Sequence, residues 1–165
     1  MGAVTAEYIS RAEWSLLITT LFYFLMNGAG LFETAVLIPK WSASPPESFQ
    51  MLRGKYGLDL KTFWIVMHSA HELTFIVAII VCWKLESIRN WLLILFALHF
   101  LVRAWTLIYF APNIIDFQKI ANTNGQASDL LKRTTRWRNL NYVRTCLFIV
   151  ISICLVPLCM KAFQL

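Results

Sequence analysis

The chain has 165 residues, of which 58% are hydrophobic, and its formal net charge is +6. Ordinary soluble domains are about 45–50% apolar, so this composition excludes a small soluble domain and predicts an integral membrane protein surrounded by a lipid bilayer. The basic segment at 131–138 adjoins a predicted span, which favours anionic headgroups rather than nucleic acid as its partner.

Four apolar runs each reach the roughly 20 residues that cross a hydrocarbon core. They cover residues 14–38, 63–83, 91–110 and 140–160, and tryptophan or tyrosine side chains mark their ends. Such aromatic belts are typical of the headgroup level. The sequence therefore predicts a single domain over 1–165 with an all-α fold, namely an integral membrane four-helix bundle.

The connections between these runs are unequal in length. The connection after the second run is short, and the other two are long and share the opposite side. In the first connection, Ser44 and Pro45 predict the start of a short amphipathic helix that stops at Gly54, and Asp59 is expected to cap the second span. Most lysines and arginines lie in the long connections, so the positive-inside rule predicts cytoplasmic long loops and both termini outside.

Polar side chains inside the predicted spans gather in the half nearest the long connections. A rise of 1.5 Å per residue puts Glu33 and His68 roughly 8 Å from that end of their spans. His71 and Glu72 lie one turn deeper, on the same helical face as His68. Asn27 on the first span lies deeper than Glu33. The third and fourth spans place four further polar residues in the same half: Arg103, His99, Asn141 and Arg144.

Charged residues within a membrane are costly and mark functional sites by default. We therefore predict a catalytic group made of His68, Glu72, Glu33 and His71. The residues expected to bind substrate are Arg103, Arg144, Asn141, Asn27, His99 and Trp137. A purely structural set of interhelical ion pairs is the alternative interpretation of the same pattern.

Three chemistries fit this set of side chains. In acid–base chemistry, His68 is the expected base, Glu72 or Glu33 orients it, and no cofactor is needed. In metal chemistry, His68, His71, Glu33 and Glu72 supply nitrogen and oxygen ligands for a single transition metal. Proton transport through the same groups is the third option, and it is easier to accommodate in a homo-oligomer.

Three short motifs lie at the ends of the predicted spans: "PKW" after the first, "YFAPN" at the end of the third and "WRNLNYVR" at the start of the fourth. With these motifs the chain resembles the small membrane proteins grouped with anthrone oxygenases. The resemblance implies oxidation of an anthrone to an anthraquinone by dioxygen, and it carries over Trp137, Asn141 and Arg144 as the fourth-span signature. The "HSAHE" segment departs from the family pattern.

A second likeness concerns mechanism alone, because His68 and Glu72 have the H-x-x-x-E spacing seen in sterol isomerases of the emopamil-binding type. We therefore expect a membrane enzyme, an oxygenase or an isomerase, that acts on a lipophilic aromatic or polycyclic small molecule. A metal-dependent oxidoreductase and a non-enzymatic bundle or small transporter remain alternatives.

Overall fold

The computed structural model describes residues 5–120 and 127–165, and within those residues it is helical with no strand. Four continuous helices are long and apolar enough to cross a membrane: Ala6–Trp41, Leu60–Val81, Glu86–Lys119 and Asp129–Ala162. The predicted all-α bundle is confirmed, and the helices run beyond the predicted apolar runs at several ends. Four such helices indicate a multi-pass membrane protein, while the sidedness of loops and termini stays a prediction.

The described residues form nine helical segments, eight of which build the four long helices. The first helix comprises α1 (Ala6–Phe32), the π-helical segment η1 (Glu33–Leu37) and α2 (Ile38–Trp41), and the second is α3 (Leu60–Val81). The third comprises α4 (Glu86–Trp105), the π-helical segment η3 (Thr106–Phe110) and α5 (Ala111–Lys119), and the fourth is α6 (Ala127–Ala162). The remaining segment, the 3₁₀ helix η2 (Glu47–Leu52), lies between α2 and α3.

The connection before α3 differs in part from its prediction. The short helix starts at Glu47 rather than at Ser44, ends at Leu52 and is a 3₁₀ helix. Two consecutive prolines, Pro45 and Pro46, explain the delay, because proline disfavours the α conformation in the residue before it and removes a backbone donor. The predicted cap is confirmed, since the Asp59 carboxylate accepts a hydrogen bond of 3.1 Å from the backbone N–H of Thr62.

Both π-helical segments come just before a proline, at the same spacing. Pro39 follows η1 after one residue, and Pro112 follows η3 after one residue. Proline lacks a backbone N–H and its ring clashes with the carbonyl four residues earlier. A wider turn ahead of the proline absorbs this mismatch without ending the helix, and such π-turns are frequent at functional sites.

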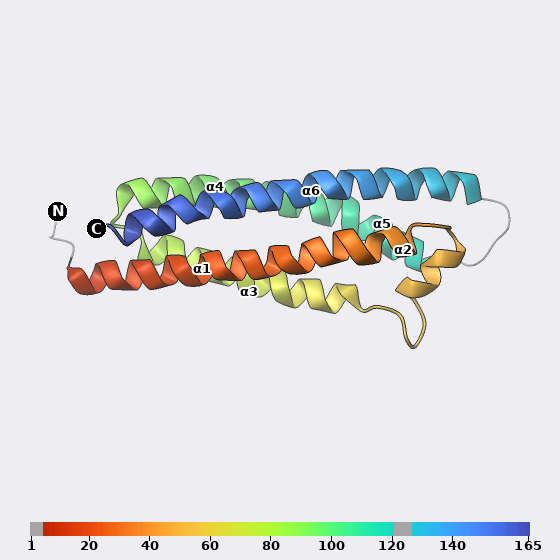
Figure 1. Cartoon of the computed structure of the whole chain (residues 1–165), viewed down its shortest axis with the longest axis horizontal. Helices are drawn as coiled ribbons and strands as arrows, with labels where there is room; N and C mark the ends of the chain where they lie inside the picture. Colours follow the sequence, from red (N-terminus) through yellow and green to blue (C-terminus); the bar gives the residue numbers. More distant parts are fainter. Residues whose placement is uncertain (1–4, 121–126) are drawn as a thin grey trace.

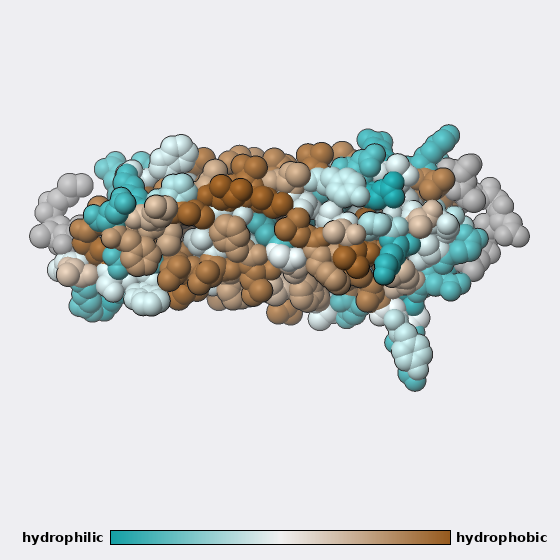
Figure 2. Space-filling view, viewed as in Figure 1, coloured by the Kyte–Doolittle hydropathy of each residue, from teal (hydrophilic) through white to brown (hydrophobic). Residues whose placement is uncertain are grey.

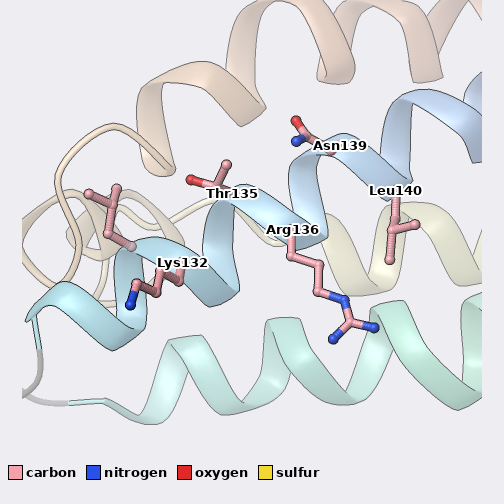
Figure 3. Close-up of a pocket in the computed structure, with 6 residues that line it drawn as sticks. Lys132, Thr135, Arg136, Asn139 and Leu140 are labelled. Atoms are coloured by element: carbon pink, nitrogen blue, oxygen red, sulfur yellow. The ribbon is translucent and has the colours of Figure 1, made fainter.

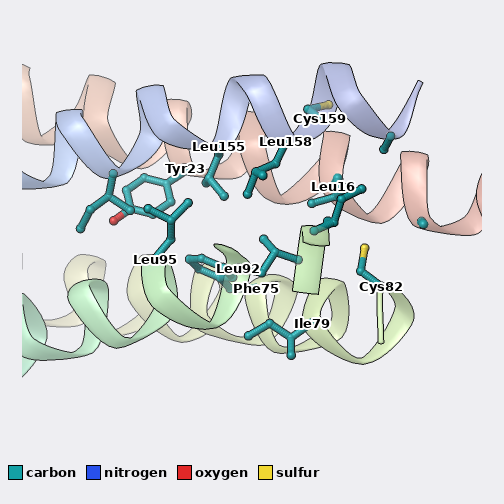
Figure 4. Packing of buried hydrophobic residues seen from close by; sticks show 14 of the residues in the cluster. Leu16, Tyr23, Phe75, Ile79, Cys82, Leu92, Leu95, Leu155, Leu158 and Cys159 are labelled. Carbon is teal, nitrogen blue, oxygen red and sulfur yellow. The ribbon is translucent and has the colours of Figure 1, made fainter. Parts of the chain in front are cut away.

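The bundle is an elongated set of roughly parallel rods, with the start of α1 and the end of α6 at one end (Figure 1). α1 packs against α3 and α6, and α4 packs against α6, while α3 and α4 contact each other less. In the half near the start of α1, the interior is a large apolar cluster that includes Leu16, Leu92 and Leu155 (Figure 4).

The opposite end is closed by a second apolar cluster, in which Trp41, Phe49, Phe117 and Trp137 pack together. On the surface, apolar side chains cover the middle of the molecule and hydrophilic ones gather at both ends (Figure 2). The lipid-facing middle therefore encloses an interior that is apolar near the termini and polar nearer the loops.

Candidate functional site

Tyr23 on α1, His71 on α3 and His99 on α4 form a compact group of rings in the interior. His68 lies one turn earlier on α3 and adjoins this group through Phe148. We call these four residues, His68 included, the histidine cluster. The ring of His71 lies 4.2 Å from that of Tyr23 and 4.9 Å from that of His99, measured between centroids. Phe148 on α6 brings its ring within 6.0 Å of His68. All four helices therefore contribute to this part of the core.

A chain of polar contacts leads from the histidine cluster to the surface. The Tyr23 hydroxyl lies 2.9 Å from Nδ1 of His99, and Nε2 of His99 lies 3.8 Å from Oε1 of Glu72. The same Glu72 oxygen accepts a hydrogen bond of 2.8 Å from Nε of Arg103. Tyr23 and His99 are buried, whereas the Glu72 side chain is 35% exposed. We call these four residues the relay. It begins at Tyr23 on α1 and ends between α3 and α4, the two neighbouring helices with the least extensive packing.

Several imidazole nitrogens in the histidine cluster have no hydrogen-bond partner among the described residues. They are Nδ1 of His68, both ring nitrogens of His71 and Nε2 of His99. Leaving a buried polar group unsatisfied costs about 1–3 kcal/mol. Such exceptions in a native interior call for an explanation, and a catalytic role, an ordered water or an ion is a common one.

A second polar group lies beside the histidine cluster and joins α6 to both π-helical segments. Arg144 donates hydrogen bonds to Oδ1 of Asn141 at 2.6 Å and to the Thr106 hydroxyl at 3.5 Å. Asn141 in turn donates to the Thr34 hydroxyl at 3.1 Å, and Thr34 shares a hydrogen bond with Thr145. We call these five residues the arginine network. Because Thr34 lies in η1 and Thr106 begins η3, both π-turns are tied to α6.

The guanidinium of Arg144 also stacks on an aromatic ring. Its Cζ lies 4.4 Å from the centroid of the Phe110 ring. Glu33 is buried at the start of η1, close to Arg144 and to the Trp64 indole. No ion pair within 4 Å involves Glu33 in the described part of the chain, so the carboxylate compensates the arginine at longer range.

The remaining predicted site residues have structural partners. Asn27 donates hydrogen bonds to the Ser152 hydroxyl at 2.8 Å and to the Phe148 carbonyl, so it fastens α1 to α6. Trp137 donates its indole N–H to the Phe110 carbonyl at 3.2 Å. This contact lies at the end of the bundle opposite the start of α1, where the two long connections lie, which we call the loop end. Both side chains are buried and satisfied, and neither belongs to the histidine cluster.

The structure brings together two of the predicted catalytic residues and two of the residues predicted to bind substrate. His71, His99, Glu72 and Arg103 meet between α3 and α4. The expected orientation of His68 by Glu72 or Glu33 does not occur among the described ion pairs, because Arg103 draws Glu72 toward α4 and His99 takes the place expected for His68.

The predicted metal ligands, His68, His71, Glu33 and Glu72, do not converge on one point. Residues 5–120 and 127–165 contain no group of three histidine, cysteine, aspartate or glutamate side chains that could hold a metal ion. The reason lies in the directions of the carboxylates, since Glu72 turns toward α4 and Glu33 lies on η1 near α6.

Tyr23 and the threonines of the arginine network were not predicted from the sequence. Tyr23 precedes Asn27 by four residues and so shares its helical face. A tyrosine in the middle of a span rather than at its ends must find a partner for its hydroxyl. The position of Tyr23 in the middle of the span was therefore the one sequence feature that indicated its role. The many other aromatic residues of the first span made this feature hard to distinguish.

No protein-family model, no curated protein and no solved structure matches the chain.

Proposed function

We propose that this protein is an integral membrane enzyme that moves a proton to or from a lipophilic small molecule, most readily an aromatic or polycyclic one. The observation that carries the proposal is the relay, in which a phenol, an imidazole and a carboxylate follow one another from the core to the α3–α4 boundary. Many catalytic sites share this arrangement: a reacting group lies beside a base, and a third residue orients the base.

Each relay residue has a distinct role in this proposal. His99 is the proton acceptor, and Glu72 orients its ring and stabilises the imidazolium that forms. Arg103 holds the Glu72 carboxylate in place through the 2.8 Å hydrogen bond. The Tyr23 hydroxyl passes the proton between substrate and His99, so that the proton removed from the substrate ends on the imidazole.

In this proposal the ring nitrogens of His68 and His71 that have no hydrogen-bond partner also contact the substrate. A neutral imidazole offers one donor and one acceptor, so the two rings can hydrogen-bond an oxygen-bearing substrate or take up a second proton. The Arg144 guanidinium, held in position by Asn141, is suited to stabilising an enolate or phenolate oxygen.

Access from the bilayer fits the position of the relay. α3 and α4 contact each other less than the other neighbouring helices do, and Glu72 is partly exposed there. A lipophilic substrate dissolved in the membrane would approach the histidine cluster along this boundary. The resemblance to anthrone oxygenases suggests an anthrone as the substrate.

Deuterium incorporation tests the proposal whatever the final product is, because exchange reports the removal of a proton from the substrate itself. Purified protein in detergent is incubated anaerobically in deuterium oxide with anthrone or with an enolisable polycyclic ketone, and mass spectrometry measures exchange. We expect exchange above the protein-free blank, and a decrease of about 10²- to 10⁴-fold in His99→Gln and Glu72→Gln.

Glu86→Gln is the matched control, because Glu86 is a glutamate at the start of α4 whose side chain is 70% exposed. It should leave exchange unchanged. Exchange at the blank rate for wild-type protein with every substrate, or full exchange in His99→Gln, would refute the assignment.

A non-enzymatic bundle is the second candidate, and one observation favours it. The Glu72–Arg103 ion pair joins α3 to α4 where their packing is least extensive, so its role could be to hold the bundle closed. In that case Glu72→Gln would lower the free energy of unfolding by several kcal/mol, because Arg103 would lose its partner, and no substrate would exchange.

A further inference from the structure

A surface hollow of about 550 Å³ lies on α6, at the loop end of the molecule (Figure 3). Two rows of side chains spaced four residues apart line it: Leu131, Thr135 and Asn139 in one row, and Lys132, Arg136 and Leu140 in the other. Residues at this spacing are neighbours on a helix surface. None of them belongs to the histidine cluster, the relay or the arginine network.

The two basic residues of the hollow differ from the basic residues beside them. Arg133 forms an ion pair of 2.6 Å with Asp116 on α5, and Arg138 donates a hydrogen bond to the Ser42 hydroxyl. Lys132 and Arg136 are exposed and have neither an ion pair nor a hydrogen bond to any described residue. The hollow therefore carries two positive charges that nothing in the described chain neutralises.

The span boundary predicted from the sequence puts the hollow at the depth of the lipid headgroups. The apolar part of the fourth span begins at Leu140, and Arg136 lies roughly 6 Å farther along the helix axis at 1.5 Å per residue. Each headgroup layer is roughly 5–8 Å thick. Lys132 lies one turn beyond Arg136, and its long side chain can bend back toward the membrane.

We propose that this hollow binds the headgroup of an anionic phospholipid from the surrounding bilayer. Arg136 and Lys132 contact the phosphate, for which the planar guanidinium offers paired donors. Thr135 and Asn139 hydrogen-bond the glycerol and ester oxygens, and Leu140 packs against the start of an acyl chain. A zwitterionic lipid fits less well because its own cation opposes the two basic side chains.

Native mass spectrometry of lipid-stripped protein in detergent tests this proposal, with phosphatidylglycerol and phosphatidylcholine as the probes. Each basic residue near an anionic surface contributes about fivefold in affinity, so Lys132→Gln with Arg136→Gln should weaken phosphatidylglycerol binding by about 30-fold. Glutamine keeps the helix propensity of the segment. The matched control is Lys40→Gln with Lys119→Gln, which removes two exposed charges at the same end of the bundle and should leave binding unchanged.

Three results would overturn the proposal. The first is equal phosphatidylglycerol binding by wild type and the Lys132/Arg136 double variant. The second is equal binding of phosphatidylglycerol and phosphatidylcholine by wild type. The third is displacement of the lipid by inorganic phosphate alone, which would make the hollow a site for free phosphate. If the double variant fails to fold, Lys132→Arg with Arg136→Lys must retain binding, and binding must weaken as salt is raised.

Discussion

The histidine cluster and the arginine network lie side by side in the same half of the bundle, yet they satisfy their polar atoms differently. In the arginine network, Arg144 and Asn141 each donate to a neighbouring side chain, and both π-turns are secured to α6. In the histidine cluster, four buried ring nitrogens have no hydrogen-bond partner within residues 5–120 and 127–165. A satisfied network stabilises and positions helices, whereas buried polar atoms without hydrogen bonds are where a catalytic role, a bound water or an ion is to be sought.

The apolar half near the start of α1 sharpens this comparison. There the four helices are held mainly by apolar packing, through residues such as Ala12, Leu16 and Leu155, which are fully buried. Helices can thus associate in this fold with an apolar interior. The polar groups in the other half exceed what such association needs, which supports the assignment of chemistry to that half.

The largest expected effect on stability comes from breaking the arginine network. Arg144→Leu should lower the free energy of unfolding by about 3–5 kcal/mol, because Glu33 loses its compensating charge and Asn141 loses its donor. Denaturant titration in mixed micelles, followed by circular dichroism, measures this change. Arg144→Lys keeps the charge and should lose less stability.

Leu155→Ala is a useful reference for that measurement, since it creates a cavity in the apolar half and should cost about 2–5 kcal/mol. It should leave the rate of deuterium incorporation into the substrate, per folded protein molecule, unchanged. An Arg144→Leu protein as stable as wild type would show that the arginine network is not structural, and the contrast between the two polar groups would fail.

Removing one atom from the histidine cluster should have a smaller effect on stability and a large one on chemistry. Tyr23→Phe deletes the hydroxyl that contacts His99 at 2.9 Å and leaves the ring packing in place. We expect the free energy of unfolding to change by about 1 kcal/mol, and deuterium exchange to fall by about 10²-fold.

Tyr142→Phe is the matched control for this variant, because Tyr142 is 43% exposed on α6. It should alter neither quantity. Full exchange in Tyr23→Phe would remove the tyrosine from the relay and leave His99 as a base that acts directly on the substrate.

The fold was predictable because apolar runs of about 20 residues have few alternatives in a membrane. The depth of the polar side chains followed from the rise of a helix, and Arg103, Glu72, His71 and His99 do meet. What the sequence did not determine is which faces oppose each other. Glu72 could turn toward His68 on its own helix or toward α4, and in the folded bundle its carboxylate pairs with Arg103 on α4.

The π-turns were likewise not predicted, although both prolines were visible at the span ends. Pro39 and Pro112 were compatible with a helix end, since proline often stops a helix. Continuation through a wide turn requires support from neighbouring helices, and the contacts of Thr34 and Thr106 with α6 provide it. Such support depends on tertiary structure and is absent from local sequence patterns.

The smallest expected effect concerns Asp59, which precedes the candidate span of α3 and caps its first turn. It tests the local stability of that turn rather than the stability of the whole bundle. Hydrogen bonds from the Thr62 hydroxyl and backbone N–H hold the pKa of the exposed Asp59 carboxyl below its ordinary value of 3.8. Since the folded form binds its proton less readily, the cap stabilises the first turn fully above pH 3.8. That stabilisation is lost as the pH falls through the lowered pKa of the folded form.

Amide hydrogen exchange at Thr62 measures this effect directly. Protection should decrease below about pH 4 in the wild type, while Asp59→Asn should keep a similar cap whose strength does not depend on pH. Asp59→Ala should lose the protection at every pH. Neither variant should change exchange at the buried helical residues around His71, because fraying of the first turn does not propagate through the packed core. If the Asp59→Ala change did reach that depth, the α3 end and the histidine cluster would form one cooperative unit.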